Sequence, residues 1–188
     1  LLDTAAAYGE AESVLGRLGA VDRFRVVTKI QPASPDDVEP CLRQCENRLG
    51  DVDLDTVLLH GASETLSNPT VWRVLDDAMA DRGGRAGVSL YSPSEWNQLE
   101  SICCERGWRV PSVIQIPMSL FDQRFEPLLP LLTSSGVEIH LRSLFLQGAA
   151  FASPDRLPPA LADLSARVGD LQDASDRLGV TPAALLVS

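Results

Sequence analysis

Short runs of β-branched and apolar residues alternate along this chain with stretches of helical spacing, and this alternation constrains the fold more than any other feature. The runs that predict strands occupy residues 1–3, 25–30, 56–60, 86–90, 113–116 and 137–141. Between them, apolar residues recur three and four positions apart, as on one face of a helix. Such repetition predicts parallel strands joined by right-handed crossovers.

Helix boundaries are marked by caps. Ser34 and Ser92 each offer an N-cap hydroxyl, followed by a proline at N1 and an acidic residue at N3. Asn68-Pro69 and Thr181-Pro182 repeat the cap and the proline. Two helix faces are expected to be buried, formed by Val38, Leu42, Cys45 and Leu49 and by Val71, Leu75, Ala78 and Met79.

A closed barrel and an open sheet share this strand–helix pattern locally. The open nucleotide-binding sheet should show G-x-G-x-x-G after its first strand, and neither this motif nor a P-loop occurs in the chain. The sequence therefore favours a single parallel barrel domain over residues 1–188. In such a barrel, polar residues at the carboxyl ends of several strands converge on one face. The proline-rich residues 153–159 predict a loop over that face.

The net charge and the cysteine spacing limit the classes of partner and metal site that this chain can have. The formal net charge is -10, which disfavours nucleic acid or an anionic membrane as a partner. No apolar run approaches the roughly 20 residues of a membrane span. The four cysteines, Cys41, Cys45, Cys103 and Cys104, show no recurring CxxC spacing. We expect free thiols in a reducing cytoplasm rather than a zinc site.

Four polar residues lie at or just after predicted strands: Asp3, Tyr8, Lys29 and His60. A lysine ammonium near a tyrosine would lower the phenol pKa, and an aspartate paired to the lysine would hold it in place. A neutral histidine beside the phenol could orient a carbonyl, so the set would reduce C=O with hydride from a nicotinamide. Taken singly, each of the four could instead have a purely structural role, as a cap, half-buried packing, a rim charge and a core histidine, respectively.

The residues that surround these four resemble the aldo-keto reductase family. The segment L-D-T-A-A-A-Y-G-E-A-E at residues 2–12 resembles that family's D-T-A-x-x-Y-G-x-x-E signature, with Leu15-Gly16 following. V-T-K at 27–29 and D-L-D-T-V-L-L-H at 53–60 resemble its lysine and histidine strands. The resemblance runs from Leu1 to Ser188 and implies a (β/α)8 TIM barrel. It also implies Tyr8 as general acid, Lys29 and Asp3 tuning it, and His60 orienting the carbonyl.

The same resemblance implies where a cofactor would bind. G-V-S at 87–89 resembles the family's G-x-S-N, but Leu90 replaces the asparagine, so only Ser89 carries over. Gln115 matches a glutamine that meets the nicotinamide carboxamide, although a core polar residue is the alternative. Residues 140–148 align with A-Y-S-P-L-x-x-G and place Arg142 where a tyrosine stacks on the nicotinamide. The predicted cofactor-binding residues are Ser89, Gln115, Arg142, Ser143 and Gln147.

We therefore expect an aldo-keto reductase that reduces an aldehyde or ketone, with a sugar-like molecule as one candidate. R-S-L-F-L-Q-G at 142–148 is similar to a bacterial branch linked to sugar and polysaccharide metabolism. NADP(H) is the expected cofactor and NAD(H) the alternative. By resemblance, the barrel lacks a strand before Leu1 and a final strand and helices after Ser188. Two other hypotheses stay open: a non-catalytic, nicotinamide-binding regulatory relative, and an inactive fragment. A lyase or isomerase ranks last, because no metal cluster or carboxylate pair is evident.

Overall fold

The computed structural model describes residues 1–187 and divides them into two compact units. The first unit comprises Leu1–Ile116 and Leu128–His140, and the second comprises Pro117–Pro127 and the chain from Leu141 onward. Ser188, the last residue of the expected single domain, lies outside the described residues. The expectation of one domain over residues 1–188 stays a prediction.

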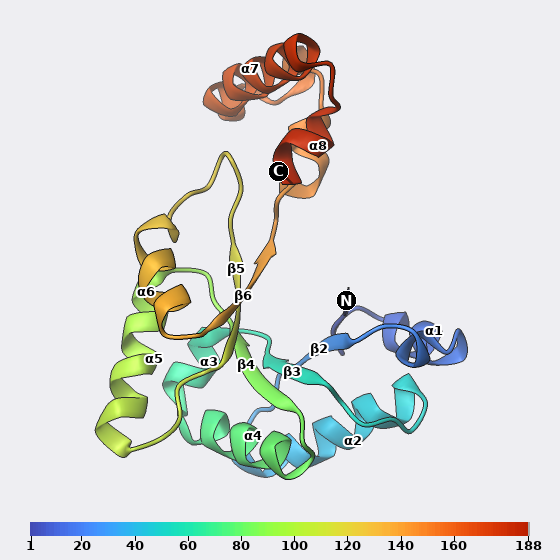
Figure 1. Cartoon of the computed structure of the whole chain (residues 1–188), viewed down its shortest axis with the longest axis vertical. Helices are drawn as coiled ribbons and strands as arrows, with labels where there is room; N and C mark the ends of the chain where they lie inside the picture. Colours follow the sequence, from blue (N-terminus) through green and yellow to red (C-terminus); the bar gives the residue numbers. More distant parts are fainter. Residues whose placement is uncertain (188) are drawn as a thin grey trace. The chain divides into compact units, whose positions relative to one another are not determined.

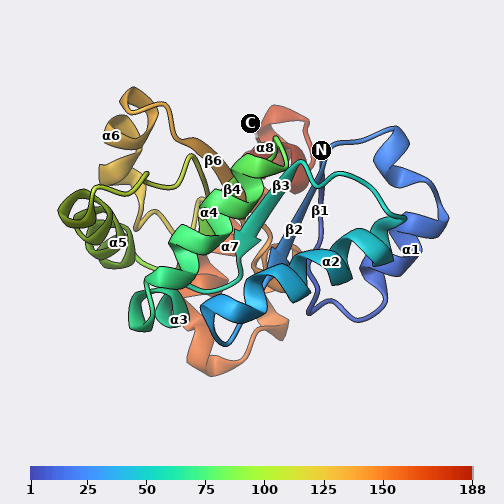
Figure 2. The ribbon, with the colours of Figure 1, turned by 90° about the horizontal axis from the view of Figure 1, so that it is seen from below.

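Six strands form one sheet whose spatial order follows the sequence, β1-β2-β3-β4-β5-β6. Figure 1 labels β2 to β6 and Figure 2 labels β1. Their bounds are β1 (Leu2–Asp3), β2 (Val26–Ile30), β3 (Thr56–Leu59), β4 (Arg85–Ser89), β5 (Val113–Pro117) and β6 (Glu138–Arg142). Each strand lies within one residue of its predicted bounds. Strands that pair in chain order without a reversal are those of a (β/α)8 barrel rather than an open, doubly wound sheet, whose strand order switches. The predicted fold class is therefore confirmed, with six parallel strands of such a barrel present.

Helices follow the strands as the sequence predicted. They are α1 (Ala11–Arg17), α2 (Val38–Leu49), α3 (Ala62–Ser67), α4 (Thr70–Asp81), α5 (Pro93–Arg106), α6 (Leu129–Ser134), α7 (Ala162–Leu178) and α8 (Pro182–Val187). Viewed from below, α2 and α4 lie along the strands β2, β3 and β4, which they contact (Figure 2). The predicted loop at residues 153–159 contains a short 3-10 turn, Pro154–Arg156.

The two predicted N-caps behave differently. At α5, the Glu95 carboxylate accepts the backbone N–H of Ser92 at 3.0 Å, which is one half of a capping box. After Ser34 the chain instead forms a 3-10 turn, Pro35–Asp37, and the α-helix begins only at Val38. Pro40 explains the delay, because it has no N–H to donate to the carbonyl four residues earlier.

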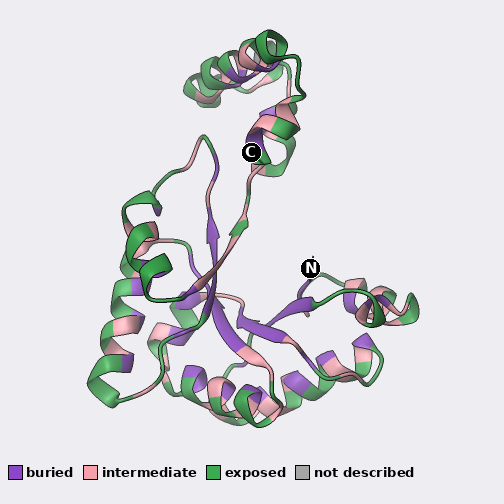
Figure 3. Cartoon of the chain, in the orientation of Figure 1, coloured by how far each residue is buried: buried purple, intermediate pink, exposed green. Residues whose placement is uncertain are grey.

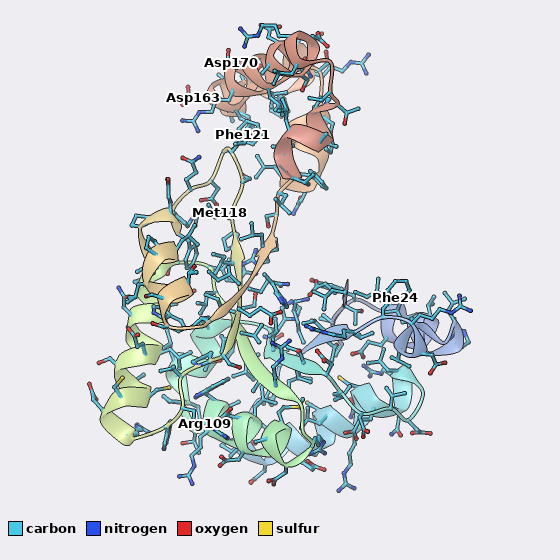
Figure 4. The ribbon with its side chains drawn as sticks, viewed as in Figure 1. Phe24, Arg109, Met118, Phe121, Asp163 and Asp170 are labelled. Carbon is cyan, nitrogen blue, oxygen red and sulfur yellow. The ribbon has the colours of Figure 1, made fainter. Side chains whose placement is uncertain are left out.

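The core of the first unit lies between the helices and the outer face of the strands. Figure 3 shows most of β2, β3 and β5 as buried. The predicted buried face of α2 is confirmed, and α4 buries Val71, Leu75 and Met79 together with Trp72. The Trp72 indole N–H donates to the carbonyl of Arg109 at 2.9 Å, on the segment between α5 and β5 (Figure 4).

The inner face of the sheet is layered along the strands. Its middle layer is apolar and consists of Val27, Leu58 and Val113, which form one buried cluster. Gly87 occupies the corresponding position of this layer on β4. A Cβ there would lie 2.2 Å from the carbonyl oxygen of Val113. β4 can therefore approach β5 this closely only with glycine at that position.

A network of ion pairs forms the layer at the amino ends of the strands. Arg85 contacts Glu138 at 2.5 Å and Asp55 at 3.7 Å, and Arg25 contacts the same two carboxylates at 3.6 Å each. His140 adds a 2.7 Å contact to Glu138. The Arg85 and His140 hydrogen bonds lower the pKa of Glu138 to about 2. These bonds join β2, β3, β4 and β6 at one end of the sheet.

Candidate active site

Four polar side chains occupy the inner face at the carboxyl end of the strands, above the apolar layer. Side chains two residues apart on a strand share a face. Lys29, His60, Ser89 and Gln115 each follow a middle-layer residue (Val27, Leu58, Gly87 and Val113, respectively) by two positions. The parallel register pairs Lys29 with Leu58 and Ser89 with Gln115, so the four are presented on one side of the sheet.

Lys29 forms the centre of this layer. It is only 1% exposed, and its Nζ donates to both carboxylate oxygens of Asp3 at 2.8 and 2.7 Å. A third hydrogen bond, of 2.7 Å, goes to the carbonyl oxygen of Thr4. A buried ammonium needs such pairing, because burial without it would favour the neutral amine. The sequence indicated the Asp3 partner but not the Thr4 carbonyl, which no side-chain pattern reveals.

Tyr8 and His60 lie beside this ion pair. The Lys29 ammonium lies 5.1 Å from the centroid of the Tyr8 ring. The rings of Tyr8 and His60 meet edge to face, with centroids 5.8 Å apart and an interplanar angle of 80°. Tyr8 is 50% exposed, so a molecule from solvent can reach its phenol. The structure thus brings Asp3, Tyr8, Lys29 and His60 together, although they come from β1, the loop after it, β2 and the end of β3.

Gln115 extends the same network from β5. Its Nε2 donates to Asp3 Oδ1 at 2.9 Å, across 112 positions of sequence. Ser89 is buried at the end of β4, and Leu90 after it is buried as well. The side chain of Gln115 is thus bonded to Asp3 of the candidate site rather than to a neighbouring strand, and its contact with a cofactor stays a prediction.

Arg142, Ser143 and Gln147 belong to the second unit. Arg142 ends β6, and its Nη1 donates to Ser143 Oγ at 3.3 Å. Ser143 and Gln147 both have positive φ angles, of 63° and 55°, in a tight and irregular turn. Their assignment as cofactor ligands stays a prediction.

Glu12 is a buried carboxylate. It is the last residue of the segment at residues 2–12 that resembles the family signature, and the sequence alone indicated no role for it. It is 1% exposed; its Oε1 accepts from Thr28 Oγ1 at 2.5 Å and its Oε2 from Arg48 at 3.2 Å. The clue available in the sequence is the four-residue spacing from Glu12 to Gly16, which puts both on one face of α1. That face packs against α2, where a Cβ at Gly16 would lie 2.3 Å from the carbonyl oxygen of Arg48.

The described residues, 1–187, offer neither a metal centre nor a disulfide. In this part of the chain, no three His, Cys, Asp or Glu side chains are grouped so that they could hold a metal ion. All four cysteines are free thiols. None of the described helices combines the length and the apolar character that a membrane crossing requires.

Comparison with protein families gives one match that spans nearly the whole chain. The model of the aldo/keto reductase family matches residues 1–186. No curated protein matches the chain.

Solved structures share the fold at low sequence identity. A glycerol dehydrogenase from Gluconobacter oxydans matches with a TM-score of 0.75 at 19% identity, over 97% of this chain and 65% of its own. An aldo/keto reductase from Klebsiella pneumoniae, in complex with NADP and acetate, matches with a TM-score of 0.69 at 24% identity, over 98% of this chain and 63% of its own. The holo form of an aldo-keto reductase from Bacillus halodurans matches with a TM-score of 0.67 at 21% identity, over 84% of this chain and 56% of its own. The chain thus spans less than two thirds of each of these structures.

Proposed function

Since the chain belongs to the aldo/keto reductase family, we propose that the protein reduces an aldehyde or ketone with hydride from NADP(H), and that Tyr8 donates the proton. The observation that carries the proposal is the cluster of Asp3, Tyr8, Lys29 and His60. In it, a charged, buried lysine lies 5.1 Å from the ring of a half-exposed tyrosine. A phenol beside a fixed ammonium is a better acid than a phenol in water.

Each of the four residues has a distinct part in the proposed reaction. The carbonyl oxygen of the substrate lies between the Tyr8 hydroxyl and the His60 ring, which hold and orient it through hydrogen bonds. The proton passes from the Tyr8 hydroxyl to that oxygen as the carbon is reduced. Lys29 stabilises the phenolate that remains, and Asp3 keeps the ammonium charged and in place through its two short bonds.

The buried polar groups at the ends of β4 and β5 suit a nicotinamide. Ser89 and Gln115 are adjacent in register, and a hydroxyl with a side-chain amide can bond both ends of a carboxamide. The nicotinamide, when bound, supplies the hydride. The NADP bound to the reductase from Klebsiella pneumoniae supports the choice of cofactor. Arg142, Ser143 and Gln147, in the second unit, are proposed as further ligands on their match to the family's motif alone, and a guanidinium can stack on a planar ring.

NADPH oxidation by the protein, measured across small aldehydes, ketones and keto-sugars, tests this proposal. We expect turnover in the parent that falls by about a thousandfold or more in Tyr8→Phe, because general acid catalysis contributes up to ~10⁴-fold. NADPH binding, followed by fluorescence, should be the same in both proteins. Equal turnover in both would refute the role of Tyr8. Binding without turnover of any carbonyl would favour a nicotinamide-binding regulatory protein instead.

A further inference from the structure

The four residues of the proposed reaction leave the buried Glu12 carboxylate unused. A carboxylate is costly to bury, and this one is stabilised by a hydroxyl and a guanidinium from two different elements. Thr28 comes from β2 and Arg48 from α2, so Glu12 ties α1 to both. Gly16 allows the backbones of α1 and α2 to approach closely around these bonds.

The position of these bonds in the chain links them to the site. α1 begins three residues after Tyr8, and the backbone N–H of Ala11 donates to the Tyr8 carbonyl at 3.2 Å. Thr28 immediately precedes Lys29 on β2, and the two side chains point to opposite faces of that strand. The Glu12–Thr28 bond on the outer face therefore joins α1, which follows the loop that carries Tyr8, to the strand that carries Lys29.

We propose that Glu12 is a positioning residue for the reduction, which acts through Thr28 to fix the Lys29 ammonium relative to the Tyr8 phenol. This inference rests on the function proposed above. A hydrogen bond of 2.5 Å to a buried carboxylate is of the strong, charge-assisted kind, and it resists sliding of α1 along β2. Without it, the ammonium and the phenol would keep their own neighbours but lose their fixed separation.

Charged and titratable groups lie around both ends of this link. Glu12 faces Arg48 and the Cys45 thiol from α2, and burial followed by the Glu12 charge raises the pKa of Cys45 far above its usual range. The ring of Tyr8 lies near Lys29, which is paired with Asp3, and meets the ring of His60.

The chain offers a direct test, because Tyr8 and Tyr91 are its only two tyrosines. In a Tyr91→Phe background, the ultraviolet absorbance of phenolate reports the titration of Tyr8 alone, with or without turnover. We expect Glu12→Gln to raise the midpoint of this titration by about one pH unit, part of the 1–3 units that a close cation supplies. The direct effect of removing a negative charge is the opposite, a lower midpoint, so the sign separates repositioning from simple electrostatics.

Glu12→Gln only weakens the hydrogen bond, because the amide oxygen can still accept from Thr28, whereas Thr28→Val removes it without changing any charge. Thr28→Val should therefore raise the midpoint as well. This variant also carries the test if Glu12→Gln does not fold, as judged by circular dichroism. Glu46→Gln is the matched control, because it breaks a 2.9 Å ion pair with Arg82 elsewhere on α2 and should leave the midpoint unchanged. A midpoint that stays the same or falls in both Glu12→Gln and Thr28→Val would overturn the proposal.

Steady-state kinetics of carbonyl reduction provide a second test of the role of Glu12. Glu12→Gln and Thr28→Val should each lower kcat by about tenfold and leave KM for NADPH unchanged, since small misplacements of reacting groups are costly. Each variant should also shift the basic limb of the pH profile of kcat to higher pH. The double variant should be no slower than the worse single variant, because Thr28→Val already removes the bond that Glu12→Gln weakens. An equal loss in Glu46→Gln would refute the positioning role. Absence of turnover in the parent would refute the proposed function alone, and the phenol titration would still decide the role of Glu12.

Discussion

The Asp3–Lys29 pair predicts an unequal cost for removing its two partners. Lys29 is 1% exposed, whereas the side chain of Asp3 is 41% exposed. Lys29→Met leaves a carboxylate that water can reach, and the main remaining cost is the buried Thr4 carbonyl without its donor, about 1–2 kcal/mol. Asp3→Asn leaves an ammonium buried without a counter-charge, for which values of about 3–5 kcal/mol are typical. The amide oxygen and the Thr4 carbonyl still accept hydrogen bonds, so we expect about 3 kcal/mol.

Urea denaturation at pH 7, with the parent, Lys29→Met and Asp3→Asn side by side, measures this difference. Asp3→Asn should be the less stable variant by about 1–2 kcal/mol, from the two costs above. Its deficit should shrink as the pH rises toward 10. The unpaired buried ammonium releases its proton more readily when folded than when unfolded, so the unfolded state binds more protons and stability rises with pH. Lys29→Met should show no such recovery. If Lys29→Met is the less stable of the two, or if both deficits are independent of pH, the charge-pairing argument is wrong.

Three further predictions concern the rest of the first unit. Glu138→Gln should cost about 1 kcal/mol at pH 7, discounted because this carboxylate is partly exposed. Its lowered pKa, about 2, means that its contribution is present above the unfolded value and is lost as the pH falls from about 4.5 to 2. In acid titrations of stability the two proteins should therefore converge at low pH, and a constant gap would contradict the assignment. Gly87→Ala should destabilise by about 2 kcal/mol or more, because the added Cβ would lie 2.2 Å from the Val113 carbonyl oxygen; an unchanged melting temperature would refute this. With a thiol reagent at neutral pH, exposed Cys104 should react well before buried Cys103, whose pKa burial raises to about 11, and the reverse order in mass spectra would refute it.

The sequence predicted the strands because two signals agree at each of them. Apolar, β-branched residues define the strand, and a polar residue or glycine marks its end, as at His60-Gly61. The convergence of Lys29 and His60 then follows from parallel register alone, without knowledge of any side-chain contact. The bonds of Asp3 to Lys29 and to Gln115 could be anticipated only in part, because hydrogen-bond partners depend on side-chain conformation.

Other features depended on packing that the sequence does not express locally. Trp72 is buried on α4, although the spacing of apolar residues did not place it on the buried face of that helix. The same spacing placed Ala78 on the buried face, but Ala78 is only half-buried. The burial of Glu12 was equally hidden, since a glutamate on a seven-residue helix normally predicts a solvated face. Its partners, Thr28 and Arg48, lie 16 and 36 positions away.

The layers on the inner face of the sheet connect these observations. A two-residue period allows one strand to contribute a residue to the ion-pair end, one to the middle layer and one to the polar carboxyl end, as Arg85, Gly87 and Ser89 do on β4. A slip of one residue would send all three to the outer face, so the apolar middle layer fixes the register on which the site depends. The requirement for glycine at position 87 is therefore also a requirement of the site, because the spacing of β4 and β5 sets the distance between Ser89 and Gln115.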